Sequence, residues 1–290
     1  MILITGATGN LGKLTLTELL KLKPSKDIAV LVRKESEKSK ALAALGVEVR
    51  YGDYSDFDSL LKAFEQIETL FFVSTHEAAQ NLAVHGNVIE ASIKSGVKRI
   101  VYTSTQGDKT LNTESGSSAD LHAWTENEIK NSGLNYTILR NAPYMESLPL
   151  ILGEKVLELG FTMPAGDGKL SFATRTDMAI ASATILSSEG YDHKTYEFGG
   201  TKSYGYKEVL AILSDIANKE LSYISPEPEV YEKQCKDAGI PEPFIAANLG
   251  FATQVKNGYF DHPTQDLAKI LGREPVLVET FLRENYKFVV

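Results

Sequence analysis

Three glycines near the start of the chain have the spacing of a nucleotide-binding turn. Gly6, Gly9 and Gly12 follow an apolar run that begins at the first residue, and the amphipathic segment Lys13 to Leu22 comes next. This order predicts a buried strand, a tight turn and a helix start. Glycine lets the backbone approach a pyrophosphate, which free N–H groups and the helix dipole attract. The stretch predicts a dinucleotide site, although such a turn can also be purely structural.

A second apolar strand supports the dinucleotide interpretation. Ile28 to Val32 comes where a βαβ unit would place its second strand. Arg33 follows at its end, where an NAD-specific site usually carries an acidic group for the ribose 2′-hydroxyl. An arginine favours the 2′-phosphate of NADPH instead, through a charge-assisted contact. We therefore expect NADPH in preference to NADH, the alternative being that Arg33 is a solvated residue that opens a helix.

Polar residues also follow the next predicted strands. Asp53 comes after the alternating segment Val47 to Tyr51 and could face the adenine, or could equally cap a helix or hold a turn. Thr75, His76 and Glu77 come after the strand Thr69 to Val73. We expect that loop to pass beneath the ribose and pyrophosphate, although a lone histidine is more often a surface or capping residue.

Another candidate loop follows the strand Asn135 to Arg140. Asn141 has the donor and the acceptor that the nicotinamide carboxamide needs, and we expect it at that end of the cofactor. Tyr144 could cover the nicotinamide ring or the substrate. Both are candidates for the reaction site.

The pair Tyr-x-x-x-Lys, which donates a proton in many NAD(P)-dependent reductases, is absent. No tyrosine of the chain has a lysine four residues later. The helix after the strand Arg99 to Ser104 instead carries His122 and Glu126, which share one face because they are four residues apart. Reduction of a ketone needs a well-placed acid, whereas reduction of a quinone makes a delocalised anion that needs less help. His122 could assist protonation, or the two residues could be a helix-surface pair.

These positions require a parallel α/β sheet. Apolar runs and amphipathic segments alternate from the first residue to about residue 200. They predict a Rossmann-type, doubly wound sheet with a smaller, mainly helical C-terminal lobe. We expect an NAD(P)-binding domain over residues 1–150, a sheet completed by about 160–200, and a helical lobe on the substrate side over residues 201–290.

Composition narrows the classes of partner and compartment. The 290 residues carry a net charge of −8, which argues against a nucleic-acid partner. Cys235 is the single cysteine, so the chain holds no internal disulfide, and a reducing compartment is the simplest interpretation. No apolar run approaches the ~20 residues of a membrane span. We expect a cytoplasmic protein with a small-molecule substrate, no metal cluster among its scattered histidines, and an open oligomeric state that includes a homodimer.

With these motifs in hand, the chain resembles the NmrA-like branch of the atypical short-chain dehydrogenase/reductases, and most closely the type 2 NAD(P)H:quinone oxidoreductases. The similar pieces run in order from residue 1 to about 200. They are Gly6–Gly12, Val32-Arg33, Gly52–Tyr54, Tyr102–Ser104, His122-x-x-Thr125-Glu126, Tyr136–Asn141, Ala165–Lys169 and Ala173–Asp177.

The resemblance implies a Rossmann domain that binds NADPH and reduces quinones without flavin. It implies cofactor contacts for Gly6, Ala7, Thr8, Gly9, Asn10, Leu11, Arg33, Thr75, His76, Glu77 and Asn141. It also sets His122 where isoflavone-reductase-like relatives hold a catalytic lysine, so that His122 and Tyr144 are the catalytic candidates. Ala142-Pro143 and Thr75-His76 depart from the quinone reductases in the loops beside the nicotinamide or substrate.

Two other functions are compatible with the same motifs. Some NmrA-like relatives bind the cofactor and report its redox state to a partner protein without catalysis. A nucleotide-sugar epimerase would share the first strand and turn, but such enzymes ordinarily use the absent Tyr-Lys pair. We therefore expect a quinone-type reductase, then a redox sensor, then an epimerase.

Overall fold

The structure, a computed structural model, describes residues 1–75, 82–107 and 118–286. The chain divides into two compact units. The first consists of Met1–Asn141 and Arg175–Phe198, and the second of Ala142–Thr174 and Gly199–Val290. The chain therefore leaves the first unit after residue 141, returns to it for residues 175–198, and leaves it again.

The first unit is built on a sheet of seven strands in the order β3-β2-β1-β4-β5-β6-β9. Every strand pairs with its neighbours in parallel. The strands are β1 (Ile2–Ile4), β2 (Ile28–Val32), β3 (Glu48–Tyr51), β4 (Thr69–Val73), β5 (Arg99–Thr105), β6 (Asn135–Asn141) and β9 (Lys194–Phe198). This order confirms the predicted Rossmann-type doubly wound sheet. The chain order reverses at β1, between β2 and β4, and such a switch point is where open α/β sheets bind their ligands at the carboxyl ends of the strands.

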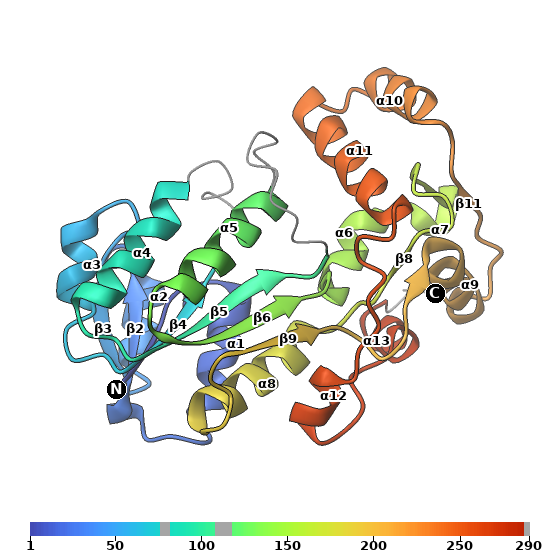
Figure 1. The fold of residues 1–290 in the computed structure, drawn as a ribbon. Helices are drawn as coiled ribbons and strands as arrows, with labels where there is room; N and C mark the ends of the chain where they lie inside the picture. The colour runs from blue at the N-terminus through green and yellow to red at the C-terminus, as the bar shows by residue number, and fades with distance from the viewer. Residues whose placement is uncertain (76–81, 108–117, 287–290) are drawn as a thin grey trace. The chain divides into compact units, whose positions relative to one another are not determined.

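Helices cover both faces of this sheet. They are α1 (Asn10–Leu19), α2 (Glu37–Ala43), α3 (Phe57–Ala63), α4 (Leu82–Lys94), α5 (Ser118–Asn131) and α8 (Arg175–Ser187), with a short 3-10 turn, η1 (Ser25–Asp27). Helices α3, α4 and α5 pack side by side, and α1 packs against α8 on the opposite face (Figure 1). All five residues of β2 are buried, as expected for a parallel strand covered on both faces.

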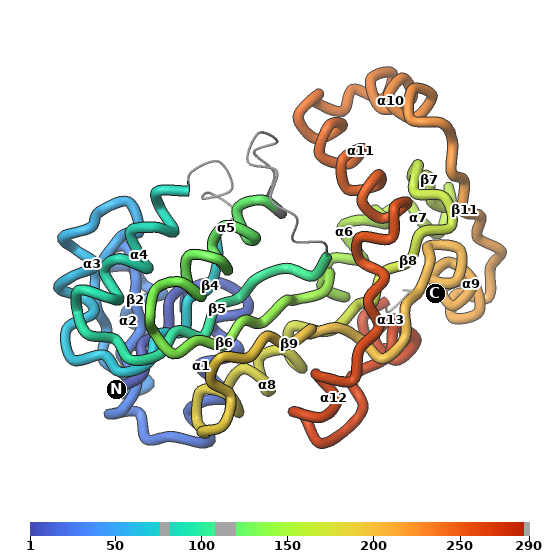
Figure 2. Tube along the Cα trace, viewed as in Figure 1, coloured from blue at the N-terminus to red at the C-terminus, as the bar shows by residue number. Residues whose placement is uncertain are grey.

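The second unit is mainly helical and has its own core, which includes Phe172, Leu213 and Phe281. Its helices are α6 (Leu148–Leu152), α7 (Val156–Leu159), α9 (Tyr206–Ala217), α10 (Pro228–Asp237), α11 (Glu242–Lys256), α12 (Asp266–Leu271) and α13 (Val278–Asn285), with the 3-10 turn η3 (Met145–Ser147) (Figure 2). Two short strand pairs, which the sequence did not predict, join β8 (Lys169–Leu170) to β10 (Tyr204–Gly205) and β7 (Phe161–Thr162) to β11 (Tyr223–Ile224). Among the described residues, no helix is long and apolar enough to cross a membrane.

Candidate functional site

The glycine turn joins β1 to α1 as its spacing predicts. Gly6 has a φ of +62°, in the left-handed region that favours glycine. The N–H of Gly9 donates to the carbonyl oxygen of Gly6 at 2.9 Å and closes the turn. A Cβ atom on Gly12 would lie 2.3 Å from that same oxygen, a separation that real Cβ atoms essentially never show. The turn therefore requires glycine at Gly6 for its conformation and at Gly12 for close packing.

The turn exposes the N-terminus of α1. Gly9 is the N-cap residue, no side chain of the described residues caps the helix, and the first turn of the helix carries no acidic residue. Thr8, Gly9 and Asn10 are exposed, whereas Ala7 and Leu11 are buried against the protein. Uncapped N–H groups and the positive end of the helix dipole favour an anion at this end. The turn therefore fits a pyrophosphate group.

Arg33 and Asp53 follow neighbouring strands on the same side of the turn. Arg33 comes directly after β2 and is exposed, and Asp53 comes two residues after β3. The Asp53 carboxylate accepts hydrogen bonds from the backbone N–H and hydroxyl of Ser55, at 2.9 and 2.6 Å. These bonds, and more weakly the positive charge of Arg33, lower the pKa of Asp53. Asp53 therefore holds a turn, the alternative weighed from the sequence, and its charge acts on Arg33.

The loop after β4 is described only as far as Thr75. The backbone of Ser74 is hydrogen-bonded to strand β5, because its N–H donates to the hydroxyl of Thr103 at 3.0 Å. Thr75 lies at the carboxyl end of β4 and is half-buried. His76 and Glu77, the other two predicted contacts of this loop, lie outside the described residues.

Asn141 ends the sixth strand and lies beside β5. Asn141 is paired in register with Thr105, and its side chain is buried. The backbone carbonyl oxygen of Asn141 accepts a hydrogen bond from the backbone N–H of Gln106 at 3.0 Å. Both strand ends are thus tied together at the carboxyl edge of the sheet. Tyr144, by contrast, belongs to the second unit, where its backbone forms an isolated bridge with Ala173.

His122 packs against a buried tyrosine of β5. The hydroxyl of Tyr102 lies 2.6 Å from Nδ1 of His122, and the two rings are tilted with centroids 5.9 Å apart. Tyr102 is fully buried, and burial raises its pKa well above the ordinary value, so that it stays protonated. His122 is half-buried one turn into α5. Because α5 follows the carboxyl end of β5, His122 lies toward the ligand-binding edge of the sheet.

Glu126 does not lie on the helix surface, because only 1% of it is exposed. Its carboxylate accepts from both Nε and Nη2 of Arg140, at 3.0 and 2.7 Å, and from the hydroxyl of Ser104 at 2.6 Å. Arg140 also contacts Glu197 on β9 at 3.2 Å. The hydroxyl of Ser104, near the carboxyl end of β5, thus donates to a buried carboxylate. The sequence shows Glu126 beside His122 on the helix. In the structure, Lys130 of α5 also lies 3.5 Å from the Glu126 carboxylate, and its closer partners come from β5 and β6.

His85 is a fully buried histidine of this region, and sequence reasoning missed it. Its side chain is fully buried, its Nδ1 lies 2.8 Å from the hydroxyl of Thr125, and Phe72 and Tyr102 lie against its ring. Its Nε2 is buried and has no hydrogen-bond partner in the part of the chain that the structure describes. Burial lowers the pKa of His85 to about 4, so that this histidine is neutral in the folded protein.

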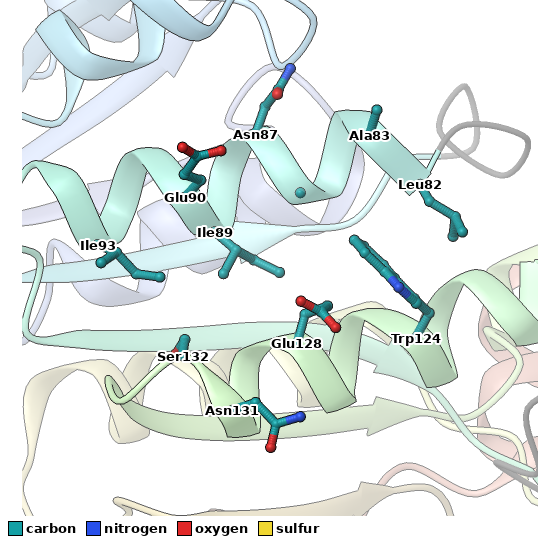
Figure 3. A pocket seen from close by; sticks show the side chains of 11 residues that line it. Leu82, Ala83, Asn87, Ile89, Glu90, Ile93, Trp124, Glu128, Asn131 and Ser132 are labelled. Atoms are coloured by element: carbon teal, nitrogen blue, oxygen red, sulfur yellow. The ribbon is translucent and has the colours of Figure 1, made fainter.

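A groove of about 520 Å³ runs between α4 and α5 on the first unit. Leu82, Ile93 and the indole of Trp124 line it together with the carboxylates of Glu90 and Glu128 (Figure 3). Of the predicted site residues that the structure describes, none lines this groove, so it is not the predicted cofactor site. Within residues 1–75, 82–107 and 118–286, no group of three or more His, Cys, Asp or Glu side chains could hold a metal ion.

Comparison with known proteins gives consistent matches along the chain. The sequence profile of the NmrA-like family matches residues 1–280. Quinone oxidoreductase 2 of Escherichia coli (strain K12) is 36% identical over 275 residues, which cover 94% of each chain. Among solved structures, the NADPH-dependent quinone oxidoreductase of Escherichia coli complexed with NADPH superposes with a TM-score of 0.89 at 32% identity, over 99% of this chain and 100% of the other. Triphenylmethane reductase of Citrobacter sp. complexed with NADP(H) superposes with a TM-score of 0.86 at 33% identity, over 97% of this chain and 98% of the other.

Proposed function

The chain belongs to the NmrA-like family, and from this premise we propose that it is an NADPH-dependent oxidoreductase that reduces a quinone or a similar small electrophile without flavin. The observation that carries the proposal is the glycine turn. It presents an uncapped helix N-terminus next to strand β2, which Arg33 directly follows. The missing Tyr-x-x-x-Lys pair supports an acceptor that needs little acid catalysis.

The cofactor would be held along the carboxyl edge of the first unit. Residues Gly6 to Leu11 would surround the pyrophosphate, since their backbone N–H groups lie at the start of α1. Arg33 would pair with the 2′-phosphate, and Thr75, His76 and Glu77 would lie along the ribose. Asn141 would bind the carboxamide. Bound NADPH supplies a hydride.

The chain's own residues then have limited chemistry to perform. The quinone takes one hydride and one proton, and the anion formed on the way is delocalised over the ring. We propose that His122 donates a hydrogen bond to the reacting oxygen, and that Tyr144 covers the substrate. We further propose that the protein acts in the cytoplasm, with Cys235 reduced and buried.

The test is anaerobic, flavin-free stopped-flow oxidation of NADPH by a benzoquinone and a naphthoquinone, with NADH in parallel. Single-turnover oxidation that is faster with NADPH and needs no added flavin would support the proposal. Tight NADPH binding without oxidation by any quinone would contradict it, and would favour a protein that senses the redox state of the cofactor.

A further inference from the structure

The groove between α4 and α5 lies apart from the predicted cofactor site, and one of its walls is aliphatic. On α4, the lining residues Leu82, Gly86, Ile89 and Ile93 recur every three or four residues, so they share the face of the helix that borders the groove. Leu82 and Ile93 are 39% and 46% exposed. This wall therefore offers apolar surface that a ligand can cover.

The opposite wall, on α5, combines an aromatic ring with a carboxylate. Trp124 and Glu128 are four residues apart on one face of the helix, and both side chains point toward α4 (Figure 3). Gly86 leaves room for the indole, since a Cβ atom there would lie 3.4 Å from Cη2 of Trp124. Trp124 is half-buried and Glu128 is exposed. The indole and the carboxylate thus lie within one helical turn of each other in the groove.

The charge of the groove is negative. Glu90 pairs with Lys94 at 2.7 Å, and its carboxylate points away from α5 (Figure 3). Glu128 takes part in none of the ion pairs among residues 1–75, 82–107 and 118–286, and the residues of these ranges that line the groove include no lysine or arginine. A cation in the groove would therefore meet a carboxylate that no described basic residue neutralises.

These features define a ligand by its chemistry. A carboxylate attracts an ammonium group, and the face of an indole ring attracts the same cation. The aliphatic wall of α4 favours an apolar body next to that charge. The volume of about 520 Å³ lies within the roughly 300–1,000 Å³ that is usual for small-molecule sites. The groove therefore suits a small organic cation.

A second copy of the chain fits this groove less well. A two-fold contact through the groove would bring the carboxylates of the two copies together. Each copy also carries a net charge of −8. Like charges that meet in an interface are repulsive, whereas the same field attracts an ammonium ligand.

We propose that the groove between α4 and α5 is a second ligand site, which binds an organic amine with an apolar body. The ammonium group binds to the carboxylate of Glu128 and the indole of Trp124, and the apolar body lies along Leu82 and Ile93. The site is separate from the proposed quinone reduction, since none of the described residues predicted for that reaction lines the groove.

The fluorescence of Trp124 reports on this site directly, because Trp124 is the single tryptophan of the chain. Phenylbutylamine, phenylbutanol and phenylbutyrate share one apolar body and differ in charge. We expect a saturable change of fluorescence with the amine, a Kd roughly five- to tenfold higher for the alcohol, and no saturation with the carboxylate. Added salt should weaken binding of the amine and not of the alcohol, because salt screens the charge of Glu128. A change that does not saturate with the amine, or equal affinities for amine and alcohol, would overturn the proposal.

Matched variants then locate the charge that binds the amine. Glu128→Gln should raise the Kd for the amine about three- to fivefold and leave the Kd for the alcohol unchanged. Glu90→Gln removes the same charge from a side chain that points away from α5, and should change the Kd for the amine less than about twofold. Both positions are exposed, so we expect both variants to fold, which circular dichroism checks. An equal loss in the two variants, or no loss in Glu128→Gln, would refute the assignment.

The oligomeric state tests the competing occupant. Sedimentation of the free protein, together with its fluorescence over a range of protein concentrations, shows whether a second copy covers Trp124. We expect fluorescence that is independent of protein concentration and changes only when the amine is added. Fluorescence that follows self-association and is unaffected by the amine would place a second copy in the groove and overturn the proposal.

Discussion

At the scale of single residues, the proposed preference for NADPH depends on Arg33. The residue is exposed after β2, and Asp53 is its acidic neighbour. A charge-assisted bond to the 2′-phosphate would be lost in Arg33→Ala, so we expect KM for NADPH to rise roughly ten- to a hundredfold while KM for NADH changes little. Steady-state kinetics with both cofactors measure this. Lys34→Ala, at the adjacent exposed position, is the control and should leave both constants unchanged.

Gly12 is the residue at which the glycine turn tolerates least change. Because a Cβ there would meet the carbonyl oxygen of Gly6 at 2.3 Å, Gly12→Ala must displace the backbone of the turn. We expect a loss of about 1–3 kcal/mol in the free energy of unfolding and at least a tenfold loss of NADPH affinity. Urea unfolding and calorimetric titration test both effects. Gly250→Ala, where a Cβ meets nothing within 4 Å, should keep full affinity.

At the scale of elements, the carboxylate of Glu126 joins α5 to β5 and β6. Its side chain is 2% exposed and that of Arg140 is 21% exposed, so this is a largely buried ion pair. Glu126→Gln leaves Arg140 with a weaker partner, and we expect a loss of up to about 3–5 kcal/mol in the free energy of unfolding. The exposed pair of Glu279 and Arg283 is the comparison. There, Glu279→Gln should cost less than about 1 kcal/mol, and similar losses in the two variants would contradict this account.

The packing of α4 on the sheet makes stability depend on pH through His85. The pKa of His85 is lowered by burial to about 4, from about 6.5 in the unfolded chain, so the unfolded state binds the proton more tightly. The contribution of neutral His85 to the free energy of unfolding should therefore be fully present above pH 6.5. The free energy of unfolding should fall by about 3 kcal/mol as the pH drops to 4. Urea unfolding across this range measures it. His85→Gln should remove most of this dependence of the free energy of unfolding on pH. His193 is exposed, and His193→Gln should leave the dependence unchanged.

The elements and the site differ in how far the sequence predicts them. Strand β4 occupies the predicted residues Thr69 to Val73, and the glycine turn lies where its spacing placed it, because both depend on local pattern. The partners of Glu126 on the sheet did not follow from pattern. Ser104 and Arg140 lie 22 and 14 residues away, and only the pairing of β5 with β6 brings them to α5. Short helices such as α6 and α7 were missed because four or five residues carry no clear period.

At the scale of the whole molecule, the family and the fold class predicted from the sequence are confirmed. The alternation of strands and helices predicts the sheet, and the NmrA-like profile spans residues 1–280. The sequence did not predict which segments of the chain belong to which unit. Residues 175–198 return to the first unit as α8 and β9, and residues 142–174 build the second unit together with 199–290. Such a return depends on contacts between distant segments, namely β9 beside β6 and α8 beside α1.

Binding of the cofactor should stabilise the whole chain by mass action. A ligand that binds only the folded state adds about 2.7 kcal/mol at one hundred times its Kd, which corresponds to a rise in Tm of roughly 5 °C for a chain of this size. We expect this shift with NADPH in a thermal scan, and a smaller one with NADH at the same concentration, because NADH lacks the 2′-phosphate that Arg33 would bind. Arg33→Ala should make the two shifts alike. Equal shifts in the wild type would contradict the assignment of Arg33, and no shift with either cofactor would contradict the dinucleotide site itself.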